Sequence, residues 1–166
     1  MRTLKSLTIA LVLGLSQTAL AKPDVKTTDD FTQIAKISKA RALPILMVFS
    51  STGCAYCVLL ENDFLRPMLI SGDYTDKVII RKVVIDQVGS VRDFNGKRIL
   101  SNAIVGKYNI SVTPTILFLD SHGHELTKRM VGVGTVDFFG GFLDQAIDQS
   151  YRRLHQTKPS VNLTER

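Results

Sequence analysis

The two cysteines of this chain, Cys54 and Cys57, lie three positions apart in the stretch FSSTGCAYCVLLENDFL, residues 49–65. Two thiols at this spacing can form a redox-active disulfide, provide half of a metal site, or pack in a core. A structural zinc site needs about four ligands, and the other soft donors in the sequence are three histidines: His122, His124 and His155. Two of these histidines flank a glycine in a predicted turn, so we expect a redox pair and neither a metal nor another cofactor.

The first 21 residues carry the pattern of a secretory signal peptide. Arg2 and Lys5 precede an apolar run over residues 7–15, and Ala19 and Ala21 form a small-x-small cleavage site. A membrane anchor or a buried helix is the alternative, but the run is short for a bilayer span. We therefore predict cleavage after Ala21 and a periplasmic location.

Composition and charge narrow the class of protein further. The 166 residues are 45% hydrophobic and 22% charged, as expected for one globular domain. The net charge of +6 falls to +4 without Arg2 and Lys5, and the remaining cations are dispersed, so we expect no nucleic-acid binding. An exported protein normally forms disulfides, but one that closes so small a loop restricts the unfolded chain little. The pair is thus poorly explained as a structural staple.

The apolar pattern predicts alternating helices and strands. Asp30 can cap a first helix, with Phe31, Ile34 and Ile37 on one side. A second helix follows the cysteines, with Leu60, Phe64 and Met68 on one face and a bend at Pro67; a third covers residues 101–108. The last begins at a Thr135 cap and is predicted to turn six side chains inward: Phe138, Phe139, Phe142, Leu143, Ala146 and Ile147.

Strands are predicted at residues 44–50, 77–86, 114–120 and 126–131. Residues 22–29 are polar and predicted to be loose, and residues 156–166 form a polar tail. This order of elements requires parallel and antiparallel strands in one sheet that is covered on both faces.

A strand that runs directly into Cys-x-x-Cys on a helix, followed much later by Thr113-Pro114 before another strand, resembles thioredoxin. The similarity covers about residues 30–150 and includes three blocks: KVVIDQ (82–87), KYNISVTPTILFLDSHGHEL (107–126) and VGVG (131–134). Among relatives, the chain is most similar to exported (SoxW-like) thioredoxins associated with bacterial sulfur oxidation. The resemblance implies an α/β thioredoxin fold over residues 30–155, with a central mixed sheet of about four to five strands and helices on both faces.

Helix geometry assigns different roles to the two cysteines. Residues i and i+3 lie on one helical face, roughly 5–6 Å apart at Cβ, so the disulfide can open and close without refolding. Cys54 is expected in the first turn, where free backbone N–H groups stabilise a thiolate, and Cys57 one turn further in and more buried. We predict that Cys54 attacks a substrate disulfide and that Cys57 resolves the mixed disulfide.

The resemblance adds three substrate-binding residues. Ala55 and Tyr56 replace the Gly-Pro pair of thioredoxin, which implies an altered redox poise and a client contact by Tyr56; plain surface shape is the alternative. Pro114 resembles the family's cis-proline, whose preceding residue, here Thr113, lends its backbone to the substrate; an ordinary strand-opening proline is the alternative. Gly53 stands where thioredoxins usually carry Trp, so client recognition is expected to differ.

The family's proton acceptor is missing from its usual place. Val48 occupies the position of a buried Asp, and Lys82 matches that residue's usual lysine neighbour, so the lysine is expected to lack its partner. Glu61, four residues after Cys57, is the candidate replacement base, and a solvated surface glutamate is the alternative. Residues 87–100 exceed what a thioredoxin needs here, and Asn95-Gly96 predicts a hairpin turn, either for partner recognition or as a passive excursion.

Together these features predict an exported, monomeric thiol–disulfide oxidoreductase that reduces client proteins. Dedicated isomerases add an N-terminal dimerisation domain, for which residues 22–29 are too few, and oxidants insert a large helical domain. A reductase in an oxidising compartment must be recharged, which implies a membrane thiol-reductase as electron donor. The rival hypothesis is a non-catalytic thioredoxin-like module that binds a client or a metal.

Overall fold

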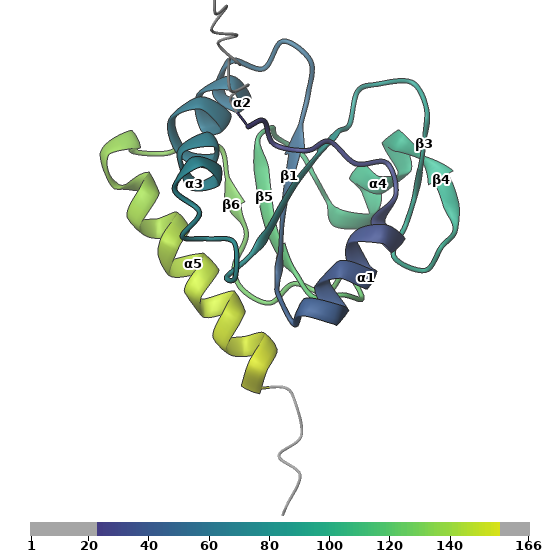
Figure 1. Cartoon of the computed structure of the whole chain (residues 1–166). Coiled ribbons are helices and arrows are strands. Elements are labelled where there is room, and N and C mark those ends of the chain that lie inside the picture. Colours follow the sequence, from purple (N-terminus) through teal and green to yellow (C-terminus); the bar gives the residue numbers. More distant parts are fainter. Residues whose placement is uncertain (1–22, 157–166) are drawn as a thin grey trace, which may run out of the picture.

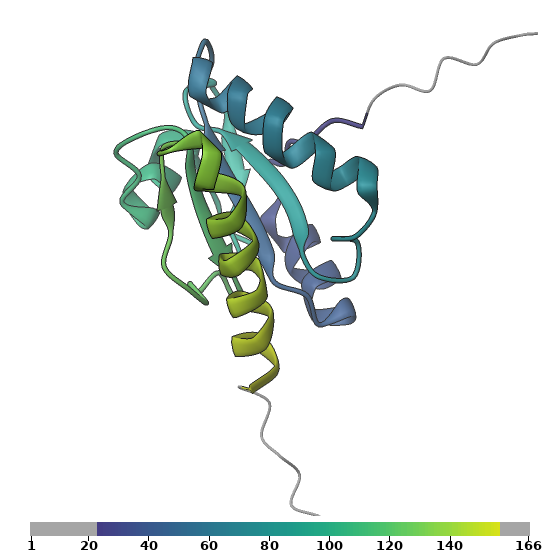
Figure 2. The same cartoon turned by 90° about the vertical axis from the view of Figure 1, so that its left-hand side faces the viewer.

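A computed structural model describes residues 23–156, in which a mixed sheet is covered by helices on both faces (Figures 1 and 2). The elements in chain order are α1 Phe31–Arg41, β1 Ile45–Ser50, α2 Ala55–Leu59, the π-helical stretch η1 Leu60–Leu65, α3 Arg66–Ser71, β2 Ile79–Val84, β3 Ser90–Arg92, β4 Arg98–Leu100, α4 Ser101–Tyr108, β5 Thr115–Leu119, β6 Met130–Val131 and α5 Val136–Gln156. The predicted signal peptide and the tail after residue 156 lie outside the described residues. Within the described part, no helix is both long and apolar enough to cross a membrane.

The sheet has four strands in the order β2-β1-β5-β6. β1 lies parallel to β2, with Ile45 opposite Ile79, and antiparallel to β5, with Phe49 opposite Thr115. β5 in turn pairs antiparallel with β6. All six residues of β1 are buried, as the continuous apolar run predicted for a strand covered on both faces. The mixed α/β thioredoxin fold predicted from the sequence is confirmed.

Alternate side chains of β1 enter two separate cores. Ile45, Met47 and Phe49 pack with residues of α1 and α4 on one face of the sheet. Leu46 and Val48 pack with residues of η1, α3 and α5 on the other face. In Figures 1 and 2, α5 and the α2–α3 run lie on the opposite side of the sheet from α1. The central strand is therefore fixed from both sides at the point where it delivers Cys54.

The helical run after the cysteines is not a uniform α-helix. Its middle section, η1, is π-helical, and the N–H of Arg66 donates to the carbonyl of Glu61. A π turn contains an extra residue, so the buried positions are Leu60, Leu65 and Met68. Phe64, which α-helical spacing places on the buried face, is instead half-buried beside Phe139, with ring centroids 4.8 Å apart.

Two of the six predicted inward-facing residues of α5 point outward. Phe138 is 65% exposed and Phe142 60% exposed. The buried stripe runs through Phe139, Leu143 and Ile147 at four-residue spacing. A residue one position before this stripe is rotated by about 100° around the helix axis, away from the sheet. The prediction was wrong for these two phenylalanines because the apolar pattern alone allows a wider stripe than the helix buries.

The predicted fourth strand, residues 126–131, is shorter and interrupted. Glu125 forms a bridge with Leu119, and β6 pairs with β5 only at Met130 and Val131. Between them, the Thr127 hydroxyl donates to Gln149 of α5 at 2.6 Å. The chain therefore pairs with β5 at two separate points and contacts α5 between them.

Residues 23–29, which were predicted to be loose, are held against the edge of the sheet. Thr27 bridges to Lys82 of β2, the N–H of Thr28 donates to the Lys82 carbonyl at 2.8 Å, and Val25 is only 4% exposed. The described residues of this segment therefore pair with the backbone N–H and carbonyl of Lys82 at the outer edge of β2. The polar composition of this segment did not predict the pairing, because the pairing is made by backbone groups and not by side chains.

Residues 90–100 form the hairpin predicted from Asn95-Gly96. β3 and β4 pair antiparallel, with Ser90 opposite Leu100, and Gly96 has φ +83° in the turn. A distant turn packs against this hairpin: a Cβ atom at residue 123 would lie 2.6 Å from the Phe94 ring. The hairpin is thus packed against the domain rather than loosely attached to it.

Candidate functional site

Cys54 and Cys57 form a disulfide at the start of the helical run. Cys54 is the N-cap of α2, and its sulfur accepts a hydrogen bond from the Cys57 N–H at 3.1 Å. Cys54 is half-buried, whereas Cys57 is 3% exposed. The difference in burial predicted for the pair is confirmed, and it leaves one sulfur more open to a substrate than the other.

The loop before Cys54 is fixed by the carboxylate of Asp86, a contact that was not predicted from the sequence. The Thr52 N–H donates to both carboxylate oxygens of Asp86, at 3.0 and 2.9 Å, and its hydroxyl lies 3.3 Å from the same group. Asp86 follows the end of β2, which lies beside β1 in the sheet. The signal for it was available, because an acid just after a parallel strand lies at the edge where the neighbouring strand also ends.

The predicted client-binding residues Thr113 and Pro114 lie beside this loop. Pairing of Phe49 with Thr115 places them next to the end of β1, and the hydroxyls of Ser51 and Thr113 are 2.7 Å apart. The Thr113–Pro114 peptide bond is cis, and the Pro114 carbonyl accepts from the Gly132 N–H at 2.8 Å. The loop that carries Cys54 and the segment before β5 are therefore joined directly.

Tyr56, the third predicted client contact, lies on the outer side of α2. Its side chain is 61% exposed in the position between the two cysteines. It is therefore available to a partner that approaches the disulfide.

Glu61 is neither a free surface carboxylate nor unpartnered. Its two carboxylate oxygens each lie 2.8 Å from the Lys82 ammonium, and the two side chains are only 15% and 22% exposed. Lys82 lies opposite Val48 in the register of β1 and β2. Lys82 was expected to lack a partner, which was wrong, because η1, the π-helical stretch after Cys57, supplies the carboxylate of Glu61.

Comparison with known proteins agrees with this geometry. Residues 31–147 match the model of the thioredoxin-like domain family. The chain belongs to the thioredoxin-like family. A search of curated protein sequences gave no match.

Solved thioredoxins share the fold. Thioredoxin of Malassezia sympodialis is 19% identical, with a TM-score of 0.52 over 81% of this chain and 98% of that one. Thioredoxin f of spinach chloroplasts is 17% identical, with a TM-score of 0.52 over 76% and 93%. Fasciola hepatica thioredoxin is 16% identical, with a TM-score of 0.51 over 76% and 99%.

As a thioredoxin-like protein, the chain carries the Cys-x-x-Cys pair of a thiol–disulfide oxidoreductase. The backbone N–H groups of the first helical turn stabilise a thiolate at Cys54 once the disulfide is reduced. Burial of Cys57 keeps it from external disulfides while leaving it within bonding distance of Cys54. The site can therefore exchange one disulfide for another.

Two of the three histidines, His122 and His124, are remote from this pair. His122 and His124 follow the end of β5, whereas Pro114 precedes its start. Both rings face Asp120, with the His124 Nδ1 atom 3.2 Å from the carboxylate. A five-residue strand separates the two ends by roughly 17 Å, so these donors cannot complete a metal site with the cysteines.

Proposed function

We propose that this protein is an exported reductase of protein disulfides, of the SoxW-like kind. The observation that carries the proposal is the asymmetric pair: a half-buried Cys54 at a helix start and a buried Cys57 in disulfide contact with it. Such an arrangement suits repeated opening and closing, because the attacking sulfur faces partners and the resolving sulfur faces only its neighbour.

The reaction proceeds in two exchanges. The Cys54 thiolate attacks one sulfur of a client disulfide, forming a mixed disulfide and releasing the other client sulfur as a thiolate. Cys57, once deprotonated, attacks the Cys54 sulfur, which forms the Cys54–Cys57 disulfide and releases the second client thiolate. Two electrons pass from the protein to the client, and a dithiol donor must return two electrons before the next turnover.

The client is expected to lie along Thr113, Pro114 and Tyr56. The hydrogen bond between Ser51 and Thr113 supports this position, since it ties the segment before β5 to the loop before Cys54. An extended client segment can pair with the backbone at residue 113, which aligns its disulfide with the attacking sulfur. Exposed Tyr56 then covers the client from the helix side.

Glu61 is our candidate for the group that takes the proton of Cys57. It lies four residues further along the helical run, it is 15% exposed, and Lys82 keeps a positive charge beside it. A shielded carboxylate near the buried thiol replaces the acceptor that Val48 cannot provide. A purely structural ion pair is the competing explanation, and the two are separated by the kinetics described below.

Export, electron supply and partners complete the proposal. The predicted signal peptide supports a periplasmic location, and a reductase there requires a membrane thiol-reductase as donor.

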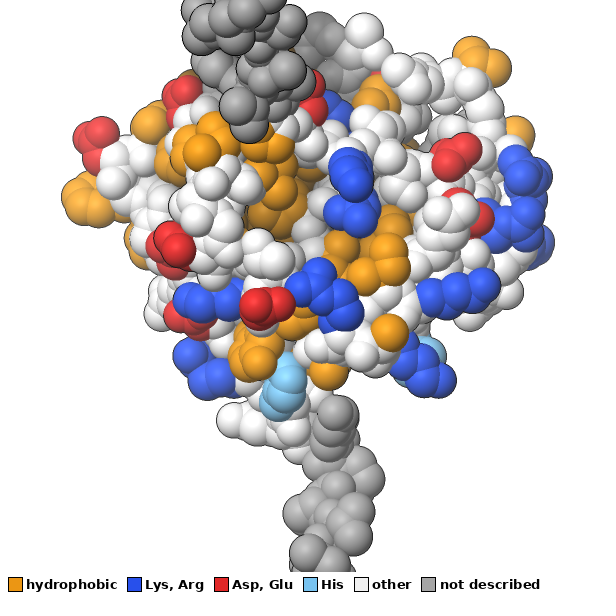
Figure 3. Space-filling view, viewed as in Figure 1, with side chains coloured by type: hydrophobic (Ala, Val, Ile, Leu, Met, Phe, Trp, Pro, Cys, Tyr) orange, Lys and Arg blue, Asp and Glu red, His pale blue; other side chains and the backbone are white. Residues whose placement is uncertain are grey.

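Within the described residues, the link from β2 to β5 contains a small hairpin and one helix, which supports a reductase rather than an oxidant with a large inserted domain. Lys and Arg side chains are spread over the face shown in Figure 3, which supports client proteins rather than nucleic acid as partners, and we expect a monomer.

A turnover assay tests the proposal. Catalytic amounts of the protein, with a chemical dithiol as electron source, should accelerate reduction of a disulfide-bonded protein well above the rate with the dithiol alone. Cys54→Ser should abolish the acceleration, while Ile70→Ser, which alters an exposed residue of α3, should retain it. A wild-type protein that binds such clients without accelerating their reduction would instead be the non-catalytic module.

A further inference from the structure

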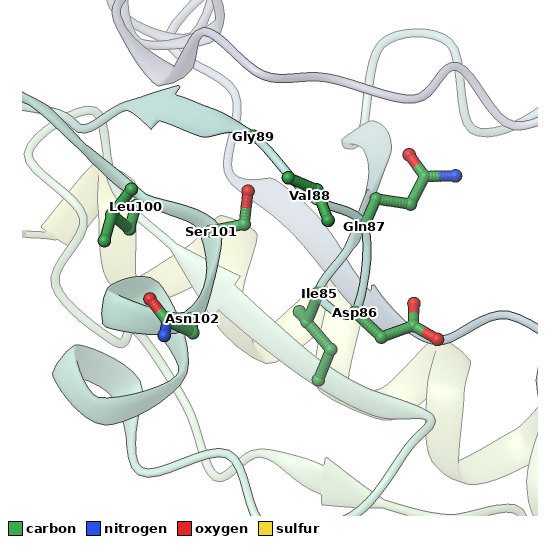
Figure 4. A pocket seen from close by; sticks show the side chains of 8 residues that line it. All are labelled: Ile85, Asp86, Gln87, Val88, Gly89, Leu100, Ser101 and Asn102. Atoms are coloured by element: carbon green, nitrogen blue, oxygen red, sulfur yellow. The ribbon is translucent and has the colours of Figure 1, made fainter.

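A pocket of about 310 Å³ lies between the end of β2 and the start of α4. In Figure 4, Ile85 and Asp86 lie on one side of it and Leu100 and Asn102 on the other, with Val88 and Ser101 between them. The extra segment, residues 87–100, supplies part of this wall. The pocket is distinct from the contacts assigned above to Thr113, Pro114 and Tyr56.

The chemistry of the lining suits an uncharged guest. Ile85, Val88 and Leu100 present apolar side chains, and Val88 is fully exposed at its rim while Leu100 is 65% exposed. Among the described residues that line the pocket, Asp86 alone is charged, and its carboxylate is already engaged by Thr52. Large apolar groups left in solvent around a hollow are typical of a binding surface.

Asp86 links the pocket to the loop that carries Cys54. The same carboxylate that lines the pocket accepts from the Thr52 N–H at 2.9 Å. Thr52 lies two residues before Cys54, so chain geometry limits the distance from the Cys54 backbone nitrogen to the Asp86 carboxylate to about 10 Å. An extended client advances about 3.3 Å per residue. At this spacing, a side chain two to four residues from the attacked cysteine can reach the pocket.

The walls are held in place before any client arrives. The Ser101 N–H donates to the Gly89 carbonyl at 3.1 Å, which closes one end of the extra segment. At the other side of the hairpin, the Arg92 N–H donates to the Asp29 carbonyl at 2.7 Å. A preformed pocket avoids the ordering cost that a loose loop would add to binding.

We propose that this pocket is a client subsite that takes one apolar side chain, two to four residues from the client cysteine attacked by Cys54. The inference rests on the proposed reductase function and adds a substrate preference to it. The extra segment then acts in client recognition, and Asp86 joins the subsite to the loop that carries the attacking thiol.

The test uses pairs of short disulfide-linked peptides that differ only in Leu or Ser at one position, two to four residues from the cysteine on either side. The measured quantity is the ratio of kcat/KM for the Leu peptide over the Ser peptide, with hydroxyethyl disulfide as a substrate that has no such side chain. The wild type should favour Leu about tenfold at one of these positions. Leu100→Ser and Asn102→Trp should reduce the ratio to near one, by removing an apolar wall and by filling the mouth, respectively.

Ile70→Ser is the matched control, because Ile70 is 60% exposed on α3, outside the pocket, and should keep the wild-type ratio. Absence of a Leu preference in the wild type, or its persistence in both pocket variants, would overturn the subsite while reduction of hydroxyethyl disulfide leaves the reductase function intact. Failure of the wild type to reduce any of these disulfides would overturn both.

Discussion

At the scale of single residues, Cys54 and Cys57 should react at different rates in the reduced protein. Cys54 is half-buried at a helix start and Cys57 is 3% exposed, so alkylation should modify Cys54 first. Mass spectrometry after brief treatment with an alkylating reagent measures the order directly. Cys57→Ser should accumulate mixed disulfides with clients, while Cys54→Ser should accumulate none. Equal alkylation rates at neutral pH would remove the assignment of roles.

A second prediction concerns the carboxylate of Glu61. If it accepts the Cys57 proton, Glu61→Gln should slow the resolving step about tenfold or more and change the first attack by Cys54 little. Stopped-flow kinetics separates the two exchanges, and the resolving step should lose one ionisation from its pH–rate profile.

Glu125→Gln is the matched control for Glu61→Gln, because it also breaks a carboxylate–cation pair, here with Arg129, outside the disulfide site. It should leave both exchanges unchanged. If Glu61→Gln behaves in the same way as this control, the pair with Lys82 serves stability alone.

The residues of the site differ in how far the sequence could predict them. The burial of Cys57 could be predicted from its position in the helix, because neighbours along the chain decide which side of a helix a residue occupies. The partner of Lys82 could not be predicted, because Glu61 lies 21 residues away and the contact depends on how the helical run crosses the sheet. The position of Asp86 after a parallel strand was visible in the sequence, but its contact was not, because its partner is a backbone N–H.

At the scale of elements, the β3–β4 hairpin depends on one buried carboxylate. Asp93 is 5% exposed and accepts from the backbone N–H groups of Asn95 and Lys97, at 3.0 and 2.9 Å, and from the Lys107 ammonium at 3.2 Å. Burial raises the pKa of Asp93, but the hydrogen bonds and the charge of Lys107 outweigh it, so the pKa lies below its ordinary value of 3.8. The ionised carboxylate therefore stabilises the folded state.

Asp93→Asn should lower the free energy of unfolding by about 1–3 kcal/mol at pH 7, because the buried end of the Lys107 contact loses its charge. Since the folded pKa is lowered, this contribution is present above the unfolded pKa and is lost as pH falls through the folded value. The difference in free energy of unfolding between the wild type and Asp93→Asn should therefore become smaller below about pH 4.

Urea unfolding at several pH values measures this gap. Asp76→Asn is the control, because Asp76 is paired with Arg41 in solvent with its side chain 94% exposed, and its gap from wild type should be small at every pH. A gap for Asp93→Asn that stays constant from pH 7 to pH 3 would contradict the assigned role.

The bounds of helices and turns were predicted correctly where the local sequence pattern decides them. Residues 101–108 form α4 as expected, and Asn95-Gly96 turns the hairpin. The π-helical η1 and the interrupted pairing before β6 were missed, since each depends on contacts with a distant element. Phe138 and Phe142 were placed inward because hydrophobicity is visible in a sequence, whereas the width of the buried face depends on what packs against it.

At the scale of the whole molecule, the fold gathers the Cys-x-x-Cys motif and the residues that contact its loop at one edge of the sheet. A central strand, buried on both faces, delivers Cys54 to the sheet edge where Asp86 and Thr113 also lie. The order of apolar runs was enough to predict this mixed sheet with helices on both faces. The pocket beside residues 87–100 was not predictable, because it forms only where the end of β2, the hairpin and the start of α4 come together.

A redox titration of the purified protein tests directly whether Cys54 and Cys57 form a reversible redox couple. Equilibration in thiol–disulfide buffers, followed by trapping of free thiols, gives the fraction of reduced protein at each potential. Cys54 and Cys57 should titrate together as one reversible two-electron couple, in which a tenfold change in the ratio of reduced to oxidised protein takes about 30 mV. The midpoint potential should lie closer to that of thioredoxin, about −270 mV, than to that of a strong oxidant, about −120 mV. A pair that stays oxidised throughout this range, or whose thiols titrate independently, would contradict a disulfide reductase.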